Sequence, residues 1–285
     1  MGIVGLASQS TPTTTLPSHA QGFTFNDYEK ALRETVAELR AQGAQMIFVT
    51  SHLCDSEIAN LAVTVQDLKI DFFGGGHCHS YGPIANSAGL VAIAGGAYFS
   101  GYGYARYTLD AATNAVLGVS YGVRTNDYPK ADPGIAELIS SWNEKVQADV
   151  GTVIGYTDHD LTFDERARLS AGSALWAFPA DLAMYAASGI KGLPKGDITL
   201  GSVISMLPYR NDVIQVSLTG AQVNQVVNQR PGLVIAGGTW TNGAVVLDAT
   251  GAPVVPAKVY SVLFDQFVYE GGDGYPPILE PSGGE

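Results

Sequence analysis

Apolar and polar residues alternate along the first half of the chain in the pattern expected of strands and helices that follow one another. Short β-branched runs at 3–6, 46–50 and 70–73 predict three strands. Two amphipathic helices are predicted between these runs: one is capped by Asn26, and the other follows Asp55. Their apolar stripes consist of Tyr28, Leu32, Val36 and Leu39 and of Ile58, Leu61, Ala62, Val65 and Leu68. This alternation predicts an α/β fold with a largely parallel sheet, in which ligands gather at the carboxyl ends of the strands.

The pattern changes around residues 126–133, where turn residues replace the alternating runs. Two further strands are predicted before this change, at 90–94 and 104–109. After it, Asp132 and Pro133 predict the start of a helix. The apolar positions of this helix are Ile135, Leu138, Ile139, Trp142 and Val146.

We therefore predict two domains, residues 1–128 and 151–285, with a linker helix at 129–150. The second domain mixes short strands and helices with many glycines. Its clearest helix begins at Thr219, with Gln222 completing a capping box. With 285 residues, the chain is long enough for two domains of about 100 to 200 residues each.

Composition and charge narrow the function classes. The chain is 46% hydrophobic and 15% charged, which excludes a disordered protein. Its 15 Lys and Arg residues against 27 Asp and Glu give a net charge of −12, which argues against a surface that binds a nucleic-acid polymer. No apolar run reaches the roughly 18 to 20 residues that a membrane-spanning helix needs. The first residues lack the pattern of a signal peptide, so the sequence by itself leaves the compartment open.

Three of the five histidines fall at the ends of two predicted strands. His52 follows the strand at 46–50, whereas His77 and His79 follow the strand at 70–73 within a glycine-rich run. Imidazole is a neutral ligand that suits zinc, manganese, iron, cobalt or nickel, and the glycines let the backbone turn sharply. A lone histidine at a strand end is more often a packing residue, but the Gly-Gly-His-Cys-His run favours a metal site.

The two cysteines are too few for a disulfide-stapled scaffold. Cys78 alternates with His77 and His79, so we expect it to point away from any metal, and we expect Cys54 to be a packing residue. A small structural zinc site is the alternative, but the spacing does not match a zinc-finger pattern.

These residues resemble a known family. The segments Val-Thr-Ser-His at 49–52 and Asp-Phe-Phe-Gly-Gly-Gly-His-Cys-His at 71–79 resemble the second half of a calcineurin-like metallophosphoesterase domain of the 5'-nucleotidase branch. Segments that look like successive motifs of that family's C-terminal substrate domain lie at 196–199, 207–211, 218–220 and 265–275. The resemblance covers nearly all of the chain. It implies a partial αββα sandwich followed by a mixed α/β 5'-nucleotidase C-terminal domain.

The resemblance also implies site residues. His52, His77 and His79 match late ligands of two divalent metal ions, which in the family are zinc, manganese, cobalt or magnesium. Six residues match substrate-contacting positions of the family. Tyr209 and Phe267 match the two rings that sandwich the base, and Asn211 and Asp273 match polar contacts to the base or ribose. Gly237 matches a glycine close to the base, and Lys191 stands where the family has an arginine. Lysine keeps the charge of that arginine but lacks its planar fork. The alternatives are that the two aromatic residues belong to a core and that residues 271–274 form only a turn.

The sequence departs from the family at its beginning. The family's Asp-x-His motif, a bridging Asp and a Gly-Asn-His-Glu segment with the catalytic histidine have no counterpart here, so no catalytic residue is identified. Three histidines without a bridging carboxylate hold a metal pair poorly, because anionic oxygens are needed to offset the repulsion between the ions. We expect a fragment that lacks the upstream third of the metal domain and is also interrupted at its C-terminal end.

The function implied by the resemblance is metal-dependent hydrolysis of nucleotide phosphoesters, with cyclic nucleotides and UDP-sugars as further substrates. One alternative is a truncated or degenerate homologue that binds nucleotides without catalysis. Another is a related di-metal hydrolase that acts on a different phosphate or a sulfur–oxygen substrate. The expected partner is a nucleotide or nucleoside, and the family suggests a secreted, periplasmic or cell-surface location. Oligomeric state does not follow from the sequence.

Overall fold

The computed structural model describes residues 1–85, 87–127 and 130–278. The chain forms two compact units. Unit 1 consists of Met1–Thr11 and Gly22–Ala131, whereas unit 2 consists of Pro12–Gln21 and the chain from Asp132 onward. The domain boundary expected at residues 128 and 129 lies outside the described residues. The helix expected as a linker, α4 (Pro133–Val150), is grouped with unit 2.

Unit 1 is built on a five-stranded sheet in the order β1-β2-β3-β5-β4. The first four of these strands are parallel, and β4 runs antiparallel to β5. The predicted parallel sheet is confirmed, with strand bounds shifted by one or two residues. The elements of unit 1 are β1 (Gly2–Leu6), α2 (Tyr28–Ala41), β2 (Ile47–Ser51), α3 (Asp55–Thr64), η2 (Gln66–Leu68), β3 (Phe72–Gly75), β4 (Tyr81–Pro83), β5 (Val91–Gly95), β6 (Gly101–Leu109) and β7 (Val116–Thr125).

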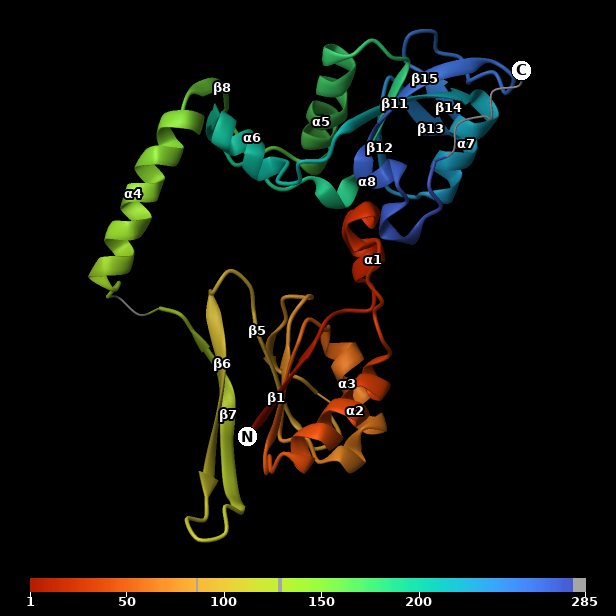
Figure 1. The fold of residues 1–285 in the computed structure, drawn as a ribbon. Coiled ribbons are helices and arrows are strands. Elements are labelled where there is room, and N and C mark those ends of the chain that lie inside the picture. The colour runs from red at the N-terminus through yellow and green to blue at the C-terminus, as the bar shows by residue number, and fades with distance from the viewer. Residues whose placement is uncertain (86, 128–129, 279–285) are drawn as a thin grey trace. The chain divides into compact units, whose positions relative to one another are not determined.

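Both predicted amphipathic helices cover one face of this sheet (Figure 1). Leu32 of α2 and Ile58 of α3 are fully buried against Val49 and Phe73 of the sheet. On the other face, the ring of Phe48 lies 5.5 Å from the ring of Tyr107 in β6. The apolar stripes of both helices therefore face the sheet, as the periodicity predicts.

Several details of unit 1 differ from the prediction. The short strand β4 has no predicted counterpart, and α3 ends at Thr64, before the expected stripe residues Val65 and Leu68. Helix α2 is capped by Asp27 and not by Asn26, because the helix begins at Tyr28 and the Asp27 side chain accepts a hydrogen bond from the Lys30 amide. Strand β7, which pairs with β6, has no predicted counterpart. Glycines at 118 and 122 and a serine at 120 interrupt its apolar run.

Unit 2 is built on a four-stranded mixed sheet in the order β11-β15-β9-β12. Alternate residues of its central strands face two separate cores: Leu182 and Phe264 pack beneath α7, whereas Ala183 and Leu263 pack beneath α5. The capping box predicted at Thr219 is present, since its side chain accepts from the Gln222 amide. The sheet strands and their helices are α5 (Phe163–Ala177), β9 (Leu182–Ala186), β11 (Val213–Thr219), α7 (Gly220–Gln229), β12 (Leu233–Ala236) and β15 (Val259–Asp265).

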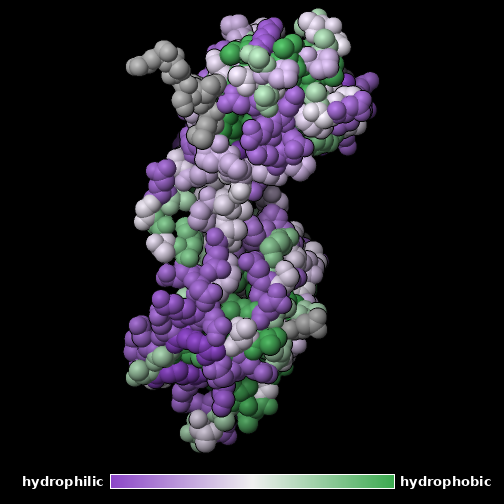
Figure 2. Space-filling model, turned by 90° about the vertical axis from the view of Figure 1, so that its right-hand side faces the viewer, coloured by the Kyte–Doolittle hydropathy of each residue, from purple (hydrophilic) through white to green (hydrophobic). Residues whose placement is uncertain are grey.

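The remaining elements of unit 2 are short and surround this sheet. They are α1 (Thr11–Thr14), which starts at the unit boundary, η1 (Pro17–Ala20), β8 (Val153–Thr157), η3 (Ala187–Gly189), β10 (Gly196–Thr199), α6 (Leu200–Met206), β13 (Gly238–Thr241), β14 (Ala244–Leu247), α8 (Gln266–Tyr269) and η4 (Gly272–Gly274). None of the helices in the described ranges is long and apolar enough to cross a bilayer. Figure 2 shows polar residues over most of one face, with apolar residues in small separate groups.

Candidate functional site

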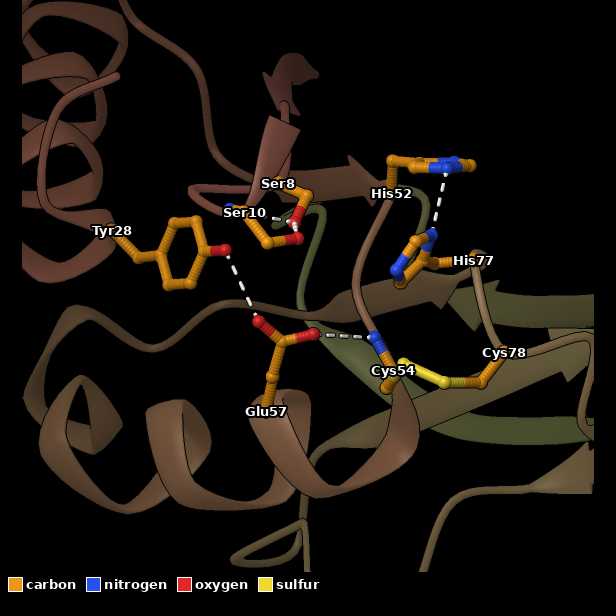
Figure 3. The surroundings of a disulfide bond; sticks show 8 residues. All are labelled: Ser8, Ser10, Tyr28, His52, Cys54, Glu57, His77 and Cys78. Carbon is orange, nitrogen blue, oxygen red and sulfur yellow. Dashed lines mark hydrogen bonds between the residues drawn. A yellow bond between two sulfur atoms is a disulfide. The ribbon is translucent and has the colours of Figure 1, made fainter. Parts of the chain in front are cut away.

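Two of the three strand-end histidines face each other in unit 1. His52 follows β2 and His77 follows β3, and these strands are parallel neighbours, so both side chains lie at the same edge of the sheet. The Nδ1 atom of His77 lies 3.2 Å from Nε2 of His52 (Figure 3). The strand-end position in the sequence thus corresponds to direct contact in space.

His79 is turned to a different neighbour. Its ring packs edge-on against Tyr98, with the ring centroids 5.8 Å apart. Both His77 and His79 have a φ of 58°, in the left-handed region that non-glycine residues rarely adopt. Such backbone strain costs about 1 to 3 kcal/mol per residue and gathers at ligand-binding sites. The loop after β3 therefore holds both of its histidines in strained backbone conformations.

The two cysteines form a disulfide, Cys54–Cys78, with Cα atoms 5.1 Å apart. The expectation that Cys54 is a packing residue was wrong, because the pairing of β2 with β3 brings the two strand-end loops within bonding distance. Cys78 turns toward Cys54, whereas His77 turns toward His52 (Figure 3). The disulfide ties together the two loops that carry these histidines.

His52 and His77 lie at hydrogen-bonding distance, and the same spacing can be compared with that of two ligands on one metal ion. Two nitrogens bound to a tetrahedral ion at about 2.0 to 2.1 Å lie about 3.3 Å apart, close to the spacing of His52 and His77. In the part of the chain that the structure describes, no group of three or more His, Cys, Asp or Glu side chains is arranged to hold a metal. Nearby Glu57 is engaged elsewhere, since it accepts hydrogen bonds from the Tyr28 hydroxyl and the Cys54 amide. The described residues thus do not supply the anionic oxygens of a two-metal centre, and the third ligand His79 stays a prediction.

A second candidate site is a cavity in unit 2 of about 780 Å³. Five of the six residues predicted to contact substrate line it, namely Lys191, Tyr209, Asn211, Phe267 and Asp273. They come from three segments: the turn after β9, the loop between α6 and β11, and the α8–η4 segment after β15. A volume of this size lies in the range of small-molecule sites.

The ring of Phe267 is seated against the backbone of η4. A Cβ atom placed on Gly272 would lie 2.4 Å from carbons of this ring, so only glycine allows the contact. Asp273, the next residue, has a φ of 59°. Its carboxylate accepts a hydrogen bond of 3.4 Å from the Ser188 hydroxyl. The η4 segment is therefore a tight turn that carries Asp273 and packs against Phe267 of α8, and both residues line the cavity.

Tyr209 and Lys191 form a second pair in the same cavity. The Tyr209 side chain is exposed, which excludes a role as a core aromatic residue. The Lys191 ammonium lies 5.7 Å from the Tyr209 ring centroid, within cation–π range, and donates a hydrogen bond of 2.9 Å to the Ser188 carbonyl. The pair places a positive charge beside an accessible ring.

The structure does not bring Gly237 to this cavity. Gly237 connects β12 to β13 with a φ of 83°, and a Cβ atom there would lie 2.4 Å from the carbonyl oxygen of Asp181. Close approach of two backbone segments explains this glycine without a ligand.

Two buried residues to which the sequence analysis assigned no role hold the Phe267 segment in place. Arg230 donates hydrogen bonds to the carbonyls of Val268 and Pro276, and burial lowers its pKa. Asp265 accepts from the amides of Ala186 and Val268, and burial raises its pKa. Arg230 lies outside the motif segments, and its backbone partners are 38 and 46 positions away in the sequence. Asp265 begins the motif segment 265–275 and caps α8 through the Val268 amide, but its contact with Ala186 joins residues 79 positions apart.

Comparisons with known proteins agree with this architecture. Residues 153–280 match the model of the 5'-nucleotidase C-terminal domain. The trifunctional nucleotide phosphoesterase YfkN of Bacillus subtilis is 24% identical over 100% of this chain and 22% of its own length. The cell wall protein Lmo0130 of Listeria monocytogenes is 23% identical over 96% of this chain and 43% of its own length. The chain thus spans less than half the length of either relative.

A solved structure extends the likeness to the whole fold. The 5'-nucleotidase precursor of Thermus thermophilus superimposes with a TM-score of 0.75 at 23% identity, over 95% of this chain and 63% of that protein. The predicted fold class is confirmed. The part of the resemblance that concerns the second domain is also confirmed, because residues 153–280 match the C-terminal domain of the family that the motifs indicated.

Proposed function

Because residues 153–280 match the 5'-nucleotidase C-terminal domain, we propose that the chain binds a nucleoside or nucleotide in the cavity of unit 2. We further propose that it belongs to a metal-dependent phosphoester hydrolase of the 5'-nucleotidase type. One observation carries the proposal: residues from three separate segments, chosen from the sequence as substrate contacts, line a single cavity.

The chemistry of the cavity suits a nucleoside. Tyr209 and Phe267 offer ring faces to a base, and stacking of this kind contributes about 1 to 3 kcal/mol per base. Asn211 can donate and accept hydrogen bonds, and Asp273 can accept from base or ribose groups. The charge of Lys191 suits an attached phosphate. Together these side chains would bind and orient the substrate.

Hydrolysis would also require the edge of the unit 1 sheet that carries His52 and His77, here called the histidine edge. His52 and His77 would hold a divalent ion, which when bound supplies Lewis-acid chemistry and a bound hydroxide. The described residues supply neither a bridging carboxylate nor an assigned catalytic histidine. We therefore expect this chain to bind nucleotides without releasing phosphate at an appreciable rate.

We also propose that the protein works outside the reducing cytosol. The Cys54–Cys78 disulfide needs an oxidising compartment to persist. One relative is named as a cell wall protein, which agrees with that placement.

Calorimetry with adenosine and AMP tests the binding step. Phe267→Ala should raise Kd by about tenfold or more, since a stacking contact of about 1.4 kcal/mol corresponds to a factor of ten. Trp176→Ala, which removes an aromatic side chain that is 91% exposed in the same unit, should leave Kd unchanged. No binding by the wild type, or equal binding by both variants, would contradict the proposal.

A phosphate-release assay with manganese or zinc tests the hydrolytic step. The matched control is the His52→Ala/His77→Ala/His79→Ala triple variant. Release above that control would show that this chain is catalytic by itself. Binding without release would favour the non-catalytic alternative for the chain as it stands.

A further inference from the structure

A short segment from near the N-terminus is part of unit 2. Residues 12–21 group with this unit, although more than a hundred residues separate them from the rest of it. The amide of Ser18 in η1 donates a hydrogen bond of 2.8 Å to Oε2 of Glu270. Figure 1 shows α1, at the start of this segment, next to α8. The segment is thus docked beside the helix that carries Phe267.

The docking contact is charge-assisted. Burial by itself raises the pKa of Glu270, but hydrogen bonds from the Gln266 side chain and the Ser18 amide lower it overall. The other carboxylate oxygen of Glu270 accepts from Gln266 Nε2 at 2.8 Å. A backbone amide that donates to an ionised carboxylate forms one of the stronger protein hydrogen bonds. Glu270 therefore fixes η1 against α8.

The docked segment also lines the cavity. Thr14, Thr15, Leu16 and His19 border the same space as Tyr209 and Phe267. Residues 12–21 contain no Lys, Arg, Asp or Glu, so this border offers hydroxyl, aliphatic and imidazole groups. The formal positive charges on the cavity lining are those of Lys191 and Arg210, which lie on other segments. An uncharged border suits the edge of a base better than a phosphate.

We propose that residues 12–21 form a wall of the nucleoside cavity, and that Leu16 and His19 are specificity-determining residues that contact the base. This inference rests on the proposed function, because it assigns a further part of the same site. Leu16 covers the apolar body of the base, and the His19 ring offers a hydrogen bond to its edge. Ligand binding should stabilise the docked state of the wall, since a ligand favours the conformation it contacts.

Affinity for adenosine tests the contact. A Leu16→Ala/His19→Ala double variant should bind adenosine about tenfold more weakly than the wild type. Gln21→Ala is the matched control, because Gln21 is exposed at the end of the same segment and does not line the cavity. Equal affinities of the wild type, double variant and control would overturn the proposal that residues 12–21 form a wall of the cavity. Absence of adenosine binding by the wild type would instead overturn the proposed function itself.

Hydrogen exchange at the Ser18 amide tests the docking directly. Glu270→Ala removes the acceptor, so exchange at Ser18 should become faster even without ligand. In the wild type, adenosine should slow this exchange. An unchanged rate in Glu270→Ala would show that the segment is not docked through this contact. Adenosine binding that leaves Ser18 exchange unaltered would show that the wall is not part of the site.

Discussion

The two candidate sites differ in how much of their chemistry the described residues supply. The cavity of unit 2 combines ring faces, amide and carboxylate groups and a fixed positive charge on one surface. The histidine edge of unit 1 brings two imidazoles into contact but places the third against Tyr98, and the described residues form no group of three or more potential metal ligands there. A base can be bound by stacking and a few hydrogen bonds, whereas a pair of divalent ions needs several anionic ligands. Binding in the cavity and hydrolysis at the histidine edge therefore need separate tests.

The two sites are also held together by different forces. At the histidine edge, a disulfide joins the loops that carry His52 and His77. In the cavity, the buried side chains of Arg230 and Asp265 hold the Phe267 segment through hydrogen bonds to its backbone. Reduction of the disulfide should destabilise the first site, whereas an added or removed side-chain volume should disturb the second. The stability of unit 2 can be followed by itself through tryptophan fluorescence, because the three tryptophans of the chain, at 142, 176 and 240, all lie in that unit.

The largest effect should follow from removing the disulfide. A cross-link over 24 residues stabilises a folded unit by about 3 kcal/mol, chiefly by restricting the unfolded chain. In a Cys54→Ser/Cys78→Ser variant, the unfolding of unit 1 should shift to lower denaturant, as measured by far-ultraviolet circular dichroism. Tryptophan fluorescence, which reports on unit 2, should keep its midpoint. An equal shift of both signals would show that the units unfold as one, and no shift would mean that the cross-link does not stabilise unit 1.

A smaller effect, confined to the cavity, should follow from Gly272→Ala. The added methyl group would lie 2.4 Å from the Phe267 ring, so the ring must move and adenosine affinity should fall about tenfold. Gly172→Ala is the control, because no heavy atom lies within 4 Å of a Cβ atom placed there. That change should leave affinity unaltered and raise stability by about 0.5 to 1 kcal/mol, as expected in a helix.

Calorimetry measures both affinities, and tryptophan fluorescence checks that unit 2 remains folded in each variant. If a folded Gly272→Ala variant binds adenosine as tightly as the wild type, the position of the Phe267 ring does not matter to the ligand. The cavity would then have to bind by its polar groups, and the contrast with the histidine edge would weaken.

The sequence predicted those features that depend on local pattern. Parallel strands pair in a fixed direction, so His52 and His77 could be placed at one edge from the order of strands alone. The capping residue Thr219 and the stripe that buries Leu32 followed from spacing.

Features that depend on contacts between distant residues could not be found in this way. The Cys54–Cys78 bond depends on how two loops turn after their strands. The contact between Ser18 of η1 and Glu270 joins residues 252 positions apart, and the local pattern around Ser18 does not indicate this partner. Arg230 and Gly237 contact backbone atoms, and backbone contacts leave no side-chain pattern at the partner position. Local periodicity contains no information about such pairs.

The smallest expected effect is a pH dependence that belongs to unit 2 alone. The Nδ1 atom of His159 lies 2.7 Å from Oδ1 of Asp158, and its Nε2 atom lies 3.1 Å from Oε1 of Glu165. Both hydrogen bonds raise the pKa of His159 above its usual value of 6.5, and the one with Asp158 has the larger effect. Protonation therefore favours the folded state: the stabilisation is complete below the unfolded value of about 6.5 and is lost as pH rises through the folded pKa. The difference in tryptophan-monitored unfolding midpoint between the wild type and His159→Gln should shrink as pH rises from about 5.5 to 8.5. Glu165, whose pKa is lowered to about 2, stays ionised throughout. Solvent screening keeps the effect small, and a difference that stays constant over this range would show that the His159 cluster contributes no linked protonation.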